Sequence, residues 1–390
     1  MKTPNPTLPS VDRTIPSNRQ LPRVECASHR PAWLVGLALV LGLAGLTPTA
    51  WSQGCVAVKN SPCSALMDGS FTNLVSAHQW IGSLTYRWYK SDRHFVGDVE
   101  QPQRQVLGSQ VVNDVSSFDV SATYGLTKQW SVTMDLPFTF ADRSSLYEHD
   151  FTNRHTMHAG GLGDIRILSD YWLFNPHTHM NGNIALGAGF KAPTGDDHAS
   201  DISYRTTGEV YRPVDPSIQP GDGGWGIILQ LQAFQKIVDN LYAYVNGSYM
   251  MTPEEQNNTQ FTIADQPRFA ALLTPLRTYN TIADQYLGRG GFSYAFWPAH
   301  GLSVSLGALI EGVPVYDAIG GSMGFRRPGY TISIEPGVSW MFGKNTLAIN
   351  TPVAVYRNRE RSAPEIALGV PGGDAAFADF SIQASFSHTF

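Results

Sequence analysis

The last twelve residues of the chain alternate between a mostly apolar and a wholly polar set of side chains. Successive side chains of a β-strand point to opposite faces, so a period of two predicts a strand with one apolar and one polar face. Such a strand separates two unlike media. The apolar set is Phe380, Ile382, Ala384, Phe386, His388 and Phe390, and the polar set is Asp379, Ser381, Gln383, Ser385, Ser387 and Thr389.

The same two-faced pattern recurs along most of the chain. In residues 115–125, for example, Phe118 and Val120 alternate with Asp119 and Ser121. Runs of this kind, bounded by turn-rich segments, predict half-buried strands. The twelve segments that fit the pattern are 79–89, 115–125, 129–138, 162–174, 182–192, 224–237, 240–251, 284–297, 301–312, 329–342, 345–357 and 377–390.

The gaps between these segments alternate in length. Gaps after even-numbered segments are short, as at 126–128 and 238–239, and gaps after odd-numbered segments are long, as at 193–223 and 252–283. Outer-membrane barrels have short periplasmic turns and long external loops. The sequence therefore predicts an all-β fold, a transmembrane up-and-down antiparallel barrel of about twelve strands. A soluble sandwich or barrel has no reason to keep this asymmetry.

Composition agrees with a surface that meets lipid. Hydrophobic residues make up 42% of the 390 residues and charged residues only 15%, against about a quarter in soluble domains. No internal apolar run reaches the roughly twenty residues that a membrane helix needs. Seven tryptophans fall near expected strand ends, where amphipathic rings prefer to lie: Trp80, Trp88, Trp130, Trp172, Trp225, Trp297 and Trp340. In a soluble protein the same tryptophans would form the core.

The N-terminus has the pattern of an export signal. A basic lead precedes the uncharged apolar run 32–46, and Pro48 then ends it. Small residues at Ala50 and Ser52 predict cleavage between residues 52 and 53. An uncleaved anchor is the alternative, although the run is short for spanning a membrane. The expected organisation is a signal peptide at 1–52, a periplasmic or lumenal segment at 53–77 and the barrel at 78–390.

Charge and cysteine content narrow the functional classes. Residues 1–52 hold five of the 27 basic and two of the 32 acidic residues, so the mature chain has 22 against 30, a net charge of −8. An acidic chain argues against nucleic acid as a partner. Cys55 and Cys63 follow the predicted cleavage point, and in an exported chain a disulfide between them is the default expectation. A lipidated Cys55 is the alternative. Segment 53–77 either plugs the barrel or forms a loose tail.

The strand alternation also assigns charged residues to the interior. If the face of Phe390 meets lipid, its polar neighbours line the lumen. One interpretation is a charge-paired network that fills and stiffens the barrel, because buried charges must be paired. The other is a polar path for a small solute. The lumen-lining candidates are Arg87, Asp119, Asp135, Asp164, Arg166, Lys191, Arg289, Glu311, Glu335 and Asp379, with Asp170 on the same face.

The sequence gives little support for a catalytic site or a cofactor site. Outer-membrane phospholipases also have twelve strands, and Ser200 and His198 lie close in sequence, but both fall in a long loop rather than on a rigid strand. The chain carries no phosphate-binding loop, haem motif or zinc pattern. We therefore expect no catalytic residues, no metal site and no cofactor, and a protein that is not an enzyme.

Recurrent glycine and proline motifs at the strand–loop junctions carry a family resemblance. They span most of the mature chain and comprise Tyr124-Gly125-Leu126-Thr127, Leu136-Pro137-Phe138, Gly161-Leu162-Gly163-Asp164, Lys191-Ala192-Pro193-Thr194-Gly195-Asp196 and Gln219-Pro220-Gly221. Similar loop motifs are Gly312-Val313-Pro314-Val315-Tyr316-Asp317 and Phe325-Arg326-Arg327-Pro328-Gly329. The chain resembles the outer-membrane transporters linked to the phenol meta-cleavage pathway.

The resemblance implies a porin-like barrel in the outer membrane of a Gram-negative bacterium. It implies passive passage of small, hydrophobic or aromatic compounds. A barrel that only anchors or scaffolds surface or periplasmic partners is the alternative. In proteins of this kind the barrel-assembly machinery reads the last strand, which makes Phe386 and Phe390 the candidate insertion signal. The expected partners are outer-membrane lipid, that machinery and a small-molecule solute.

Overall fold

The structure is a computed structural model that describes residues 74–264 and 275–390. The expected signal peptide at 1–52, the pair Cys55 and Cys63, and most of segment 53–77 lie outside the described residues. All described residues belong to one compact unit, Ala50–Phe390.

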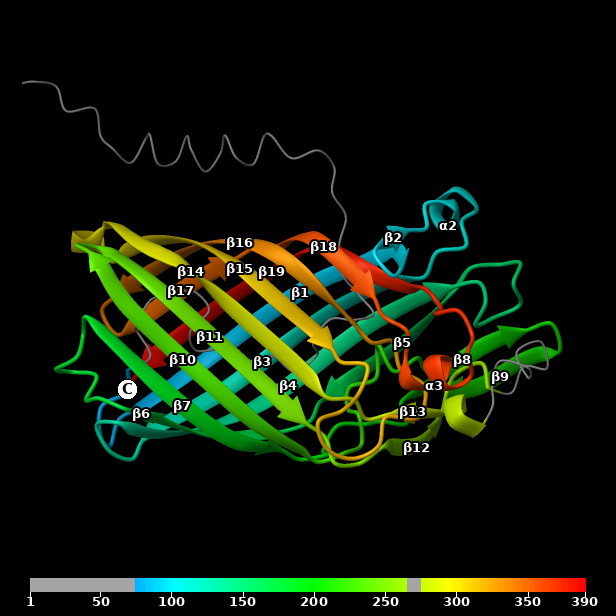
Figure 1. Ribbon diagram of the computed structural model, residues 1–390, viewed down its shortest axis with the longest axis horizontal. Helices are drawn as coiled ribbons and strands as arrows, with labels where there is room; N and C mark the ends of the chain where they lie inside the picture. Colours follow the sequence, from blue (N-terminus) through cyan, green and yellow to red (C-terminus); the bar gives the residue numbers. More distant parts are fainter. Residues whose placement is uncertain (1–73, 265–274) are drawn as a thin grey trace, which may run out of the picture. The chain divides into compact units, whose positions relative to one another are not determined.

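One antiparallel sheet closes on itself to form a barrel (Figure 1). Its fifteen strands include the short β2 (Val99–Glu100), and two pairs of strands each continue a single wall position, which leaves twelve positions. The predicted twelve-stranded barrel is therefore confirmed. In chain order the wall is β1 (Trp80–Val96), β3 (Val112–Gly125), β4 (Trp130–Ser145), β5 (His155–Leu162) continued by β6 (Arg166–Trp172), β7 (Gly182–Lys191), β10 (Gly226–Val238), β11 (Leu241–Met251), β14 (Gln285–Trp297), β15 (Leu302–Val313), β16 (Gly329–Phe342), β17 (Asn345–Asn350) continued by β18 (Val353–Arg359), and β19 (Ala375–Thr389).

The first and last strands close the barrel. β1 pairs with β19 from Ile81 opposite Thr389 to Phe95 opposite Ala375, with register shifts near Ser91. Closure matters because a backbone group left unpaired in hydrocarbon costs several kcal/mol. The Phe390 N–H also donates to the Trp80 carbonyl at 2.9 Å, which ties the end of the chain to the start of the wall.

Two wall positions are interrupted where the sequence carries Gly or Pro. Between β5 and β6 the register against β4 shifts by one residue, from Phe138 opposite Leu162 to Asp135 opposite Arg166. The Gly163 N–H still donates to the Pro137 carbonyl at 2.7 Å. Between β17 and β18 stands Pro352, which has no N–H to give to a neighbouring strand. β18 keeps its pairing with β16, but only Val353 pairs with β19.

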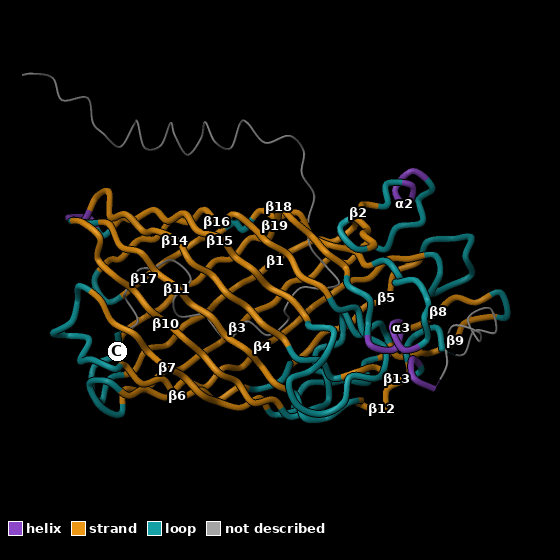
Figure 2. Tube along the Cα trace, in the orientation of Figure 1, coloured by secondary structure: helices purple, strands orange, loops and turns teal. Residues whose placement is uncertain are grey.

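The short turns and the long loops gather at opposite ends of the barrel, here called the turn end and the loop end (Figure 2). The 3₁₀ helix η3 (Pro298–His300) lies in a turn. The long loops hold all the other small elements: β2, α2 (Gln103–Val106), the hairpin of β8 (Ser200–Arg205) and β9 (Gly208–Pro213), the pair β12 (Gln256–Gln260) and β13 (Tyr279–Thr281), η2 (Pro275–Arg277) and α3 (Ala363–Ala367). No helix among the described residues is long and apolar enough to cross a membrane.

The outer face of the wall is apolar and the inner face is polar. On β10, Ile227, Leu229 and Leu231 are exposed, whereas Ile228 and Gln230 between them are buried. On β16, Ile334 and Val338 are exposed, and Ser333, Glu335 and Ser339 are buried. An exposed band of large apolar side chains around a closed barrel is typical of a surface in contact with lipid.

Several strands run farther toward the loop end than the sequence predicts. β1 continues from the expected limit at residue 89 to Val96, and β4 continues from 138 to Ser145. These extensions carry charged and polar residues on both faces, as in Asp92, Arg93 and His94. A strand that rises beyond the lipid band has no apolar medium on its outer side, so the alternation that marks a strand disappears.

The expected belt of interface tryptophans is correct for most of its members and wrong for Trp172. Trp80, Trp130, Trp297 and Trp340 are exposed beside the short turns. Trp172 is only 8% exposed and packs edge-on against Phe234, with ring centroids 5.8 Å apart. Its position on β6 has the same parity as the buried Arg166 and Leu168, which places it on the inner face.

Candidate functional site

The charged residues assigned to the interior lie on the face of their strands opposite to the exposed apolar residues. Most are almost fully buried, and Asp119 keeps the largest exposed side-chain fraction, 17%. Each of them forms an ion pair within the described residues. The set is Arg87, Asp119, Asp135, Asp164, Arg166, Lys191, Arg289, Glu311, Glu335 and Asp379.

Seven of these residues form three ion-paired groups, here together called the central network. Arg87 pairs with Glu311 at 2.9 Å. Arg166 pairs with Asp119 at 2.8 Å and with Asp135 at 3.7 Å, and Arg289 approaches Glu335 at 3.6 Å. The central network therefore holds four acids and three arginines inside the barrel.

The remaining predicted residues pair nearer the loop end. Lys191 at the end of β7 contacts Asp164 at 3.0 Å and also Asp222. Asp164 in turn accepts a hydrogen bond from the Gly195 N–H at 3.0 Å. These contacts fix the long 192–225 loop to the rim of the wall.

Asp379 on β19 binds two arginines of the adjoining wall. Arg93 of β1 donates to its Oδ1 at 2.7 Å, and Arg357 of β18 contacts the same oxygen. Arg357 also donates to the Ala378 carbonyl at 3.1 Å. Side-chain contacts thus join β18 to β19 where the backbone ladder between them is nearly absent.

At the turn end, the segment just before β1 packs inside the wall. Leu74 lies against a buried cluster of Trp172, Ala185 and Phe234. The backbone of Ser76 passes so close to Gly125 that a Cβ there would lie 2.1 Å from the Ser76 carbonyl oxygen. The described end of segment 53–77 therefore occupies part of the barrel interior.

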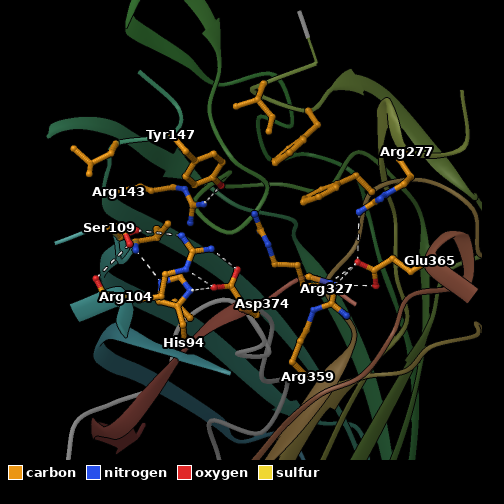
Figure 3. A pocket seen from close by; sticks show the side chains of 18 of the residues that line it. His94, Arg104, Ser109, Arg143, Tyr147, Arg277, Arg327, Arg359, Glu365 and Asp374 are labelled. Carbon is orange, nitrogen blue, oxygen red and sulfur yellow. Dashed lines mark hydrogen bonds and ion pairs between the residues drawn. The ribbon is translucent and has the colours of Figure 1, made fainter. Parts of the chain in front are cut away.

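At the loop end, five of the six long loops converge around a cavity of about 500 Å³ (Figure 3). Its lining includes residues from the end of β1, the loops after β1 and β4, the loop between β11 and β14, the loop after β15, and the loop before β19. The polar and charged lining residues are His94, Arg104, Ser109, Arg143, Tyr147, Arg277, Arg327, Arg359, Glu365 and Asp374. We call this space the loop-end cavity.

Arginines outnumber carboxylates around the loop-end cavity. Asp374 pairs with Arg104 at 2.8 Å and also contacts His94 at 2.9 Å. Glu365 receives both Arg359 at 3.2 Å and Arg277 at 3.4 Å. Figure 3 shows these two groups on opposite sides of the cavity, with Arg277 and Arg359 reaching Glu365 and Arg327 beside Arg359. We call these three arginines the cationic pole.

A second shared carboxylate lies behind the wall of the cavity. Asp215 contacts Arg327 at 2.7 Å and Arg143 at 3.1 Å, and Arg143 also pairs with Glu148 at 2.9 Å. Burial favours the neutral acid, but the charges of Arg143 and Arg327 outweigh it and hold the pKa of Asp215 well below its usual range.

The pKa values of Asp374 and Glu365 are also held below their ordinary values. Burial alone would raise each pKa, but the hydrogen bond from His94 to Asp374 and the charge of Arg359 beside Glu365 outweigh this effect. The five arginines that line the cavity pair with four carboxylates: Asp374, Glu365, Asp215 and Glu148.

Aromatic rings form the apolar wall of the cavity beside the cationic pole. Phe261 and Phe325 stack with ring centroids 3.6 Å apart and planes 14° apart. The Arg327 guanidinium lies over the Phe325 ring at 4.7 Å, a geometry that favours a cation on an aromatic face. Leu146, Phe151 and Ile263 extend the apolar lining.

Sequence reasoning did not identify the loop-end cavity. Its residues come from loops that lack periodicity, so no pattern brings them together. The one available signal was the motif Phe325-Arg326-Arg327-Pro328-Gly329, whose Phe325 and Arg327 both line the cavity. The remaining lining residues meet only because the barrel places the loop ends side by side.

The residues that the sequence suggested for catalysis and for membrane insertion lie outside the loop-end cavity. The Ser200 hydroxyl donates to the His198 backbone carbonyl at 2.8 Å, and the His198 ring contacts Asp197. Among the described residues, Asp196, Asp197 and His198 are the one close cluster of metal-ligand types, and they lie on the surface. Phe386 and Phe390 are both exposed on the outer face.

No family model matches the sequence, and no curated protein matches it. An outer-membrane channel from Pseudomonas putida F1 aligns with 82% of this chain and 98% of its own length, at 14% identity and a TM-score of 0.52. A mutant of the monoaromatic hydrocarbon channel TodX (10% identity, 86% and 95% coverage) and the β-domain of the Bordetella autotransporter BrkA (12%, 80% and 100%) reach TM-scores of 0.41 and 0.40, too low to add to the argument. The first similarity shows that this chain has the barrel fold of an outer-membrane channel.

Proposed function

We propose that this protein is a passive channel of the Gram-negative outer membrane for small hydrophobic or aromatic compounds. The observation that carries the proposal is the loop-end cavity. It lies where the long loops converge on the barrel, and aromatic side chains such as Phe261 and Phe325 line it. Binding sites for small ligands are concave and mostly apolar, with a few polar groups that fix orientation.

Export and membrane insertion belong to the same proposal. Cleavage between residues 52 and 53 would release the mature chain into the periplasm. The barrel-assembly machinery would then recognise Phe386 and Phe390 on the exposed face of β19. The apolar outer face of the wall would seat the barrel in lipid.

We further propose monoaromatic solutes of the phenol type. The support is the resemblance of the motifs at Gly161-Leu162-Gly163-Asp164 and Phe325-Arg326-Arg327-Pro328-Gly329 to transporters of the phenol meta-cleavage pathway. A passive channel needs no catalytic residue and no cofactor, because the solute moves down its own gradient.

A scaffold without transport is the second candidate. The central network favours it, because Arg87, Glu311 and their neighbours place paired charges inside the barrel, where they obstruct a solute. Planar-bilayer recordings of the refolded protein distinguish the two. A channel gives discrete conductance steps that phenol blocks in a concentration-dependent way, and liposomes containing it swell in phenol faster than protein-free liposomes. A scaffold gives neither response.

A further inference from the structure

We propose that a second, smaller cavity at the loop end binds the hydroxyl group of a neutral single-ring solute through the side-chain amide of Asn280. The inference deepens the proposed channel function and rests on it, because it names the group that separates phenols from hydrocarbons of the same size. The cavity measures about 110 Å³. We call it the amide cavity, after Asn280 and Gln285 in its lining.

The amide cavity adjoins the loop-end cavity, because Phe325 and Arg327 line both. On another side it reaches the barrel wall. Gln285, at the start of β14, has the same parity as the buried Leu287 and Arg289, so it stands on the inner face of the wall. The lining of the amide cavity thus extends from the loop-end cavity to the inner face of the barrel.

The fold holds Asn280 in place before any solute arrives. Asn280 is the middle residue of β13, among the loops at the loop end (Figure 1). The Phe325 N–H donates to the Tyr279 carbonyl at 2.7 Å, and the Thr281 N–H donates to the Phe325 carbonyl at 3.1 Å. Side chains alternate along a strand, so Asn280 points away from the face of its two neighbours. Only 1% of Asn280 is exposed.

The amide of Asn280 has no hydrogen-bond partner among the described residues, either on its oxygen or on its nitrogen. The Gln285 Oε1 is likewise buried without a partner in this part of the chain. Buried polar groups are almost always hydrogen-bonded, because an unsatisfied group keeps the cost of leaving water. A hydroxyl both accepts and donates, so it can accept from the Asn280 nitrogen and donate to an amide oxygen. Binding would remove the cost of the unsatisfied amide.

The rest of the lining favours a neutral solute with an apolar body. Each of the three charged lining residues already has an ion-pair partner: Asp222 pairs with Lys191, Arg326 with Asp317, and Arg327 with Asp215. A charged solute would compete with these ion pairs, whereas a hydroxyl would not. Val313 and Phe325 supply apolar surface for a ring. A hydrocarbon of the same shape fits this surface but offers nothing to the amide.

Asn183 provides a matched control at the turn end of the barrel. It is also buried, with 3% exposed, but its amide is satisfied. Its Oδ1 accepts from the Phe174 N–H at 3.2 Å, and its Nδ2 donates to the Phe174 carbonyl at 2.9 Å. Replacement of Asn183 by Leu removes hydrogen bonds that the fold uses. The same replacement at Asn280 removes only an unsatisfied polar group, a change that is neutral or stabilising.

Fluorine NMR titration of the refolded full-length protein in detergent tests the inference. The probes are 4-fluorophenol and 4-fluorotoluene, which differ in a hydroxyl against a methyl group, and protein-free detergent corrects for their partition into micelles. We expect the unmodified protein to bind 4-fluorophenol at least tenfold more tightly, because the hydrocarbon leaves the polar groups of the site unpaired. Equal affinity for the two probes would overturn the proposal without any variant.

Variants then assign the amide. Asn280→Leu should weaken 4-fluorophenol binding about tenfold, leave 4-fluorotoluene binding within twofold and preserve the midpoint of urea unfolding. Asn183→Leu should lower that midpoint and leave the binding of both probes within twofold. Gln285→Met, which removes the second amide, should reduce the preference for 4-fluorophenol by a smaller factor. An Asn280→Leu protein that folds and keeps the full preference would refute the site. If that variant does not fold, an undiminished preference in Gln285→Met refutes it instead.

The site and the channel can fail separately, because binding in detergent needs no passage of solute. A protein that prefers 4-fluorophenol but gives neither conductance nor liposome swelling would refute the channel and keep the site. A protein that conducts but binds both probes equally would refute the site and keep the channel.

Discussion

Arg87 on β1 and Glu311 on β15 are joined by two hydrogen bonds, of 2.9 and 3.0 Å, although three wall positions lie between their strands. The wall runs from β1 through β19, β17 with β18, and β16 to β15. Both side chains are at least nine-tenths buried. The ion pair therefore crosses the barrel interior and does not join neighbouring strands of the wall.

Removal of this ion pair should lower the stability of the barrel and widen the path through its interior. Glu311→Ala removes the carboxylate that accepts both of these hydrogen bonds, and breaking a buried ion pair costs about 3–5 kcal/mol. Replacing both residues, as in Arg87→Met with Glu311→Met, removes both charges and should recover most of that stability. Denaturant unfolding in detergent measures the cost. We also expect single-channel conductance to rise at least twofold in the double variant, and an unchanged conductance would mean that the solute path avoids this contact.

The segment before β1 should control the turn end of the barrel. A side chain at Gly125 would strike the Ser76 carbonyl, and the Gly125 carbonyl accepts a 2.7 Å hydrogen bond from the His78 N–H. Gly125→Ala should displace residues 74–78 and destabilise the protein by about 1–3 kcal/mol, as overpacking does. Gly247→Ala is the control, because its Cβ meets nothing closer than 3.6 Å.

The same pair of variants tests whether segment 53–77 plugs the barrel. If it does, Gly125→Ala should raise the conductance and Gly247→Ala should leave it unchanged. Deletion of residues 53–77 should raise the conductance at least as much. Identical conductance in all these proteins would rule out a plug at the turn end.

Docking of the β8–β9 hairpin should depend on pH through His149. The His149 Nδ1 accepts a hydrogen bond from the Tyr204 N–H at 3.1 Å, so the docked hairpin requires a neutral ring. Burial lowers the pKa of His149 below its ordinary value of 6.5. Among the charges that face it, His155 and Arg205 lower the pKa further, whereas Glu148 and Asp150 oppose them.

Because the docked histidine binds a proton less readily than the free one, docking is stable above about pH 6.5 and weakens as the pH falls below it. The loss is at most about 1.4 kcal/mol per pH unit for one proton. Hydrogen exchange of residues 200–213 between pH 8 and pH 5 measures it. His149→Gln should abolish the dependence, and the exposed His158→Gln should preserve it. Flat exchange in the unmodified protein would contradict the prediction.

The barrel could be predicted from the sequence because an apolar outer face and a polar inner face impose the same alternation on every strand. Ile334 and Glu335 are neighbours that face opposite media, and the alternation alone separates them. The same rule fails where the outer medium changes. Asp92 and Arg93 rise beyond the lipid band on β1, and there a regular strand carries no pattern to mark it.

Contacts between loops could not be predicted from the sequence, because no local sequence pattern indicates which loops meet. Arg327 and Asp215 lie 112 residues apart and form a close ion pair only because the barrel brings the two loops together. Parity likewise gives a residue its face but not its neighbours. Trp172 illustrates this limit. Its residue type and its place near a strand end favoured the membrane interface, but its position in the alternation of β6 places it on the inner face, where it packs against Phe234.

The proposal that the outer face of the barrel meets lipid can be tested by placing a charge on that face. Leu229 stands on the outer face of β10, well inside the apolar band, and Val238 stands on the same strand at the turn end. An arginine near the centre of the hydrocarbon costs about 2–4 kcal/mol, falling to about 0–1 near the interfaces. Leu229→Arg should therefore destabilise the barrel in phospholipid vesicles by several times more than Val238→Arg, with urea unfolding as the measurement. In a water-soluble barrel both exposed positions would accept arginine at little cost, so equal effects would remove the membrane assignment and the channel proposal with it.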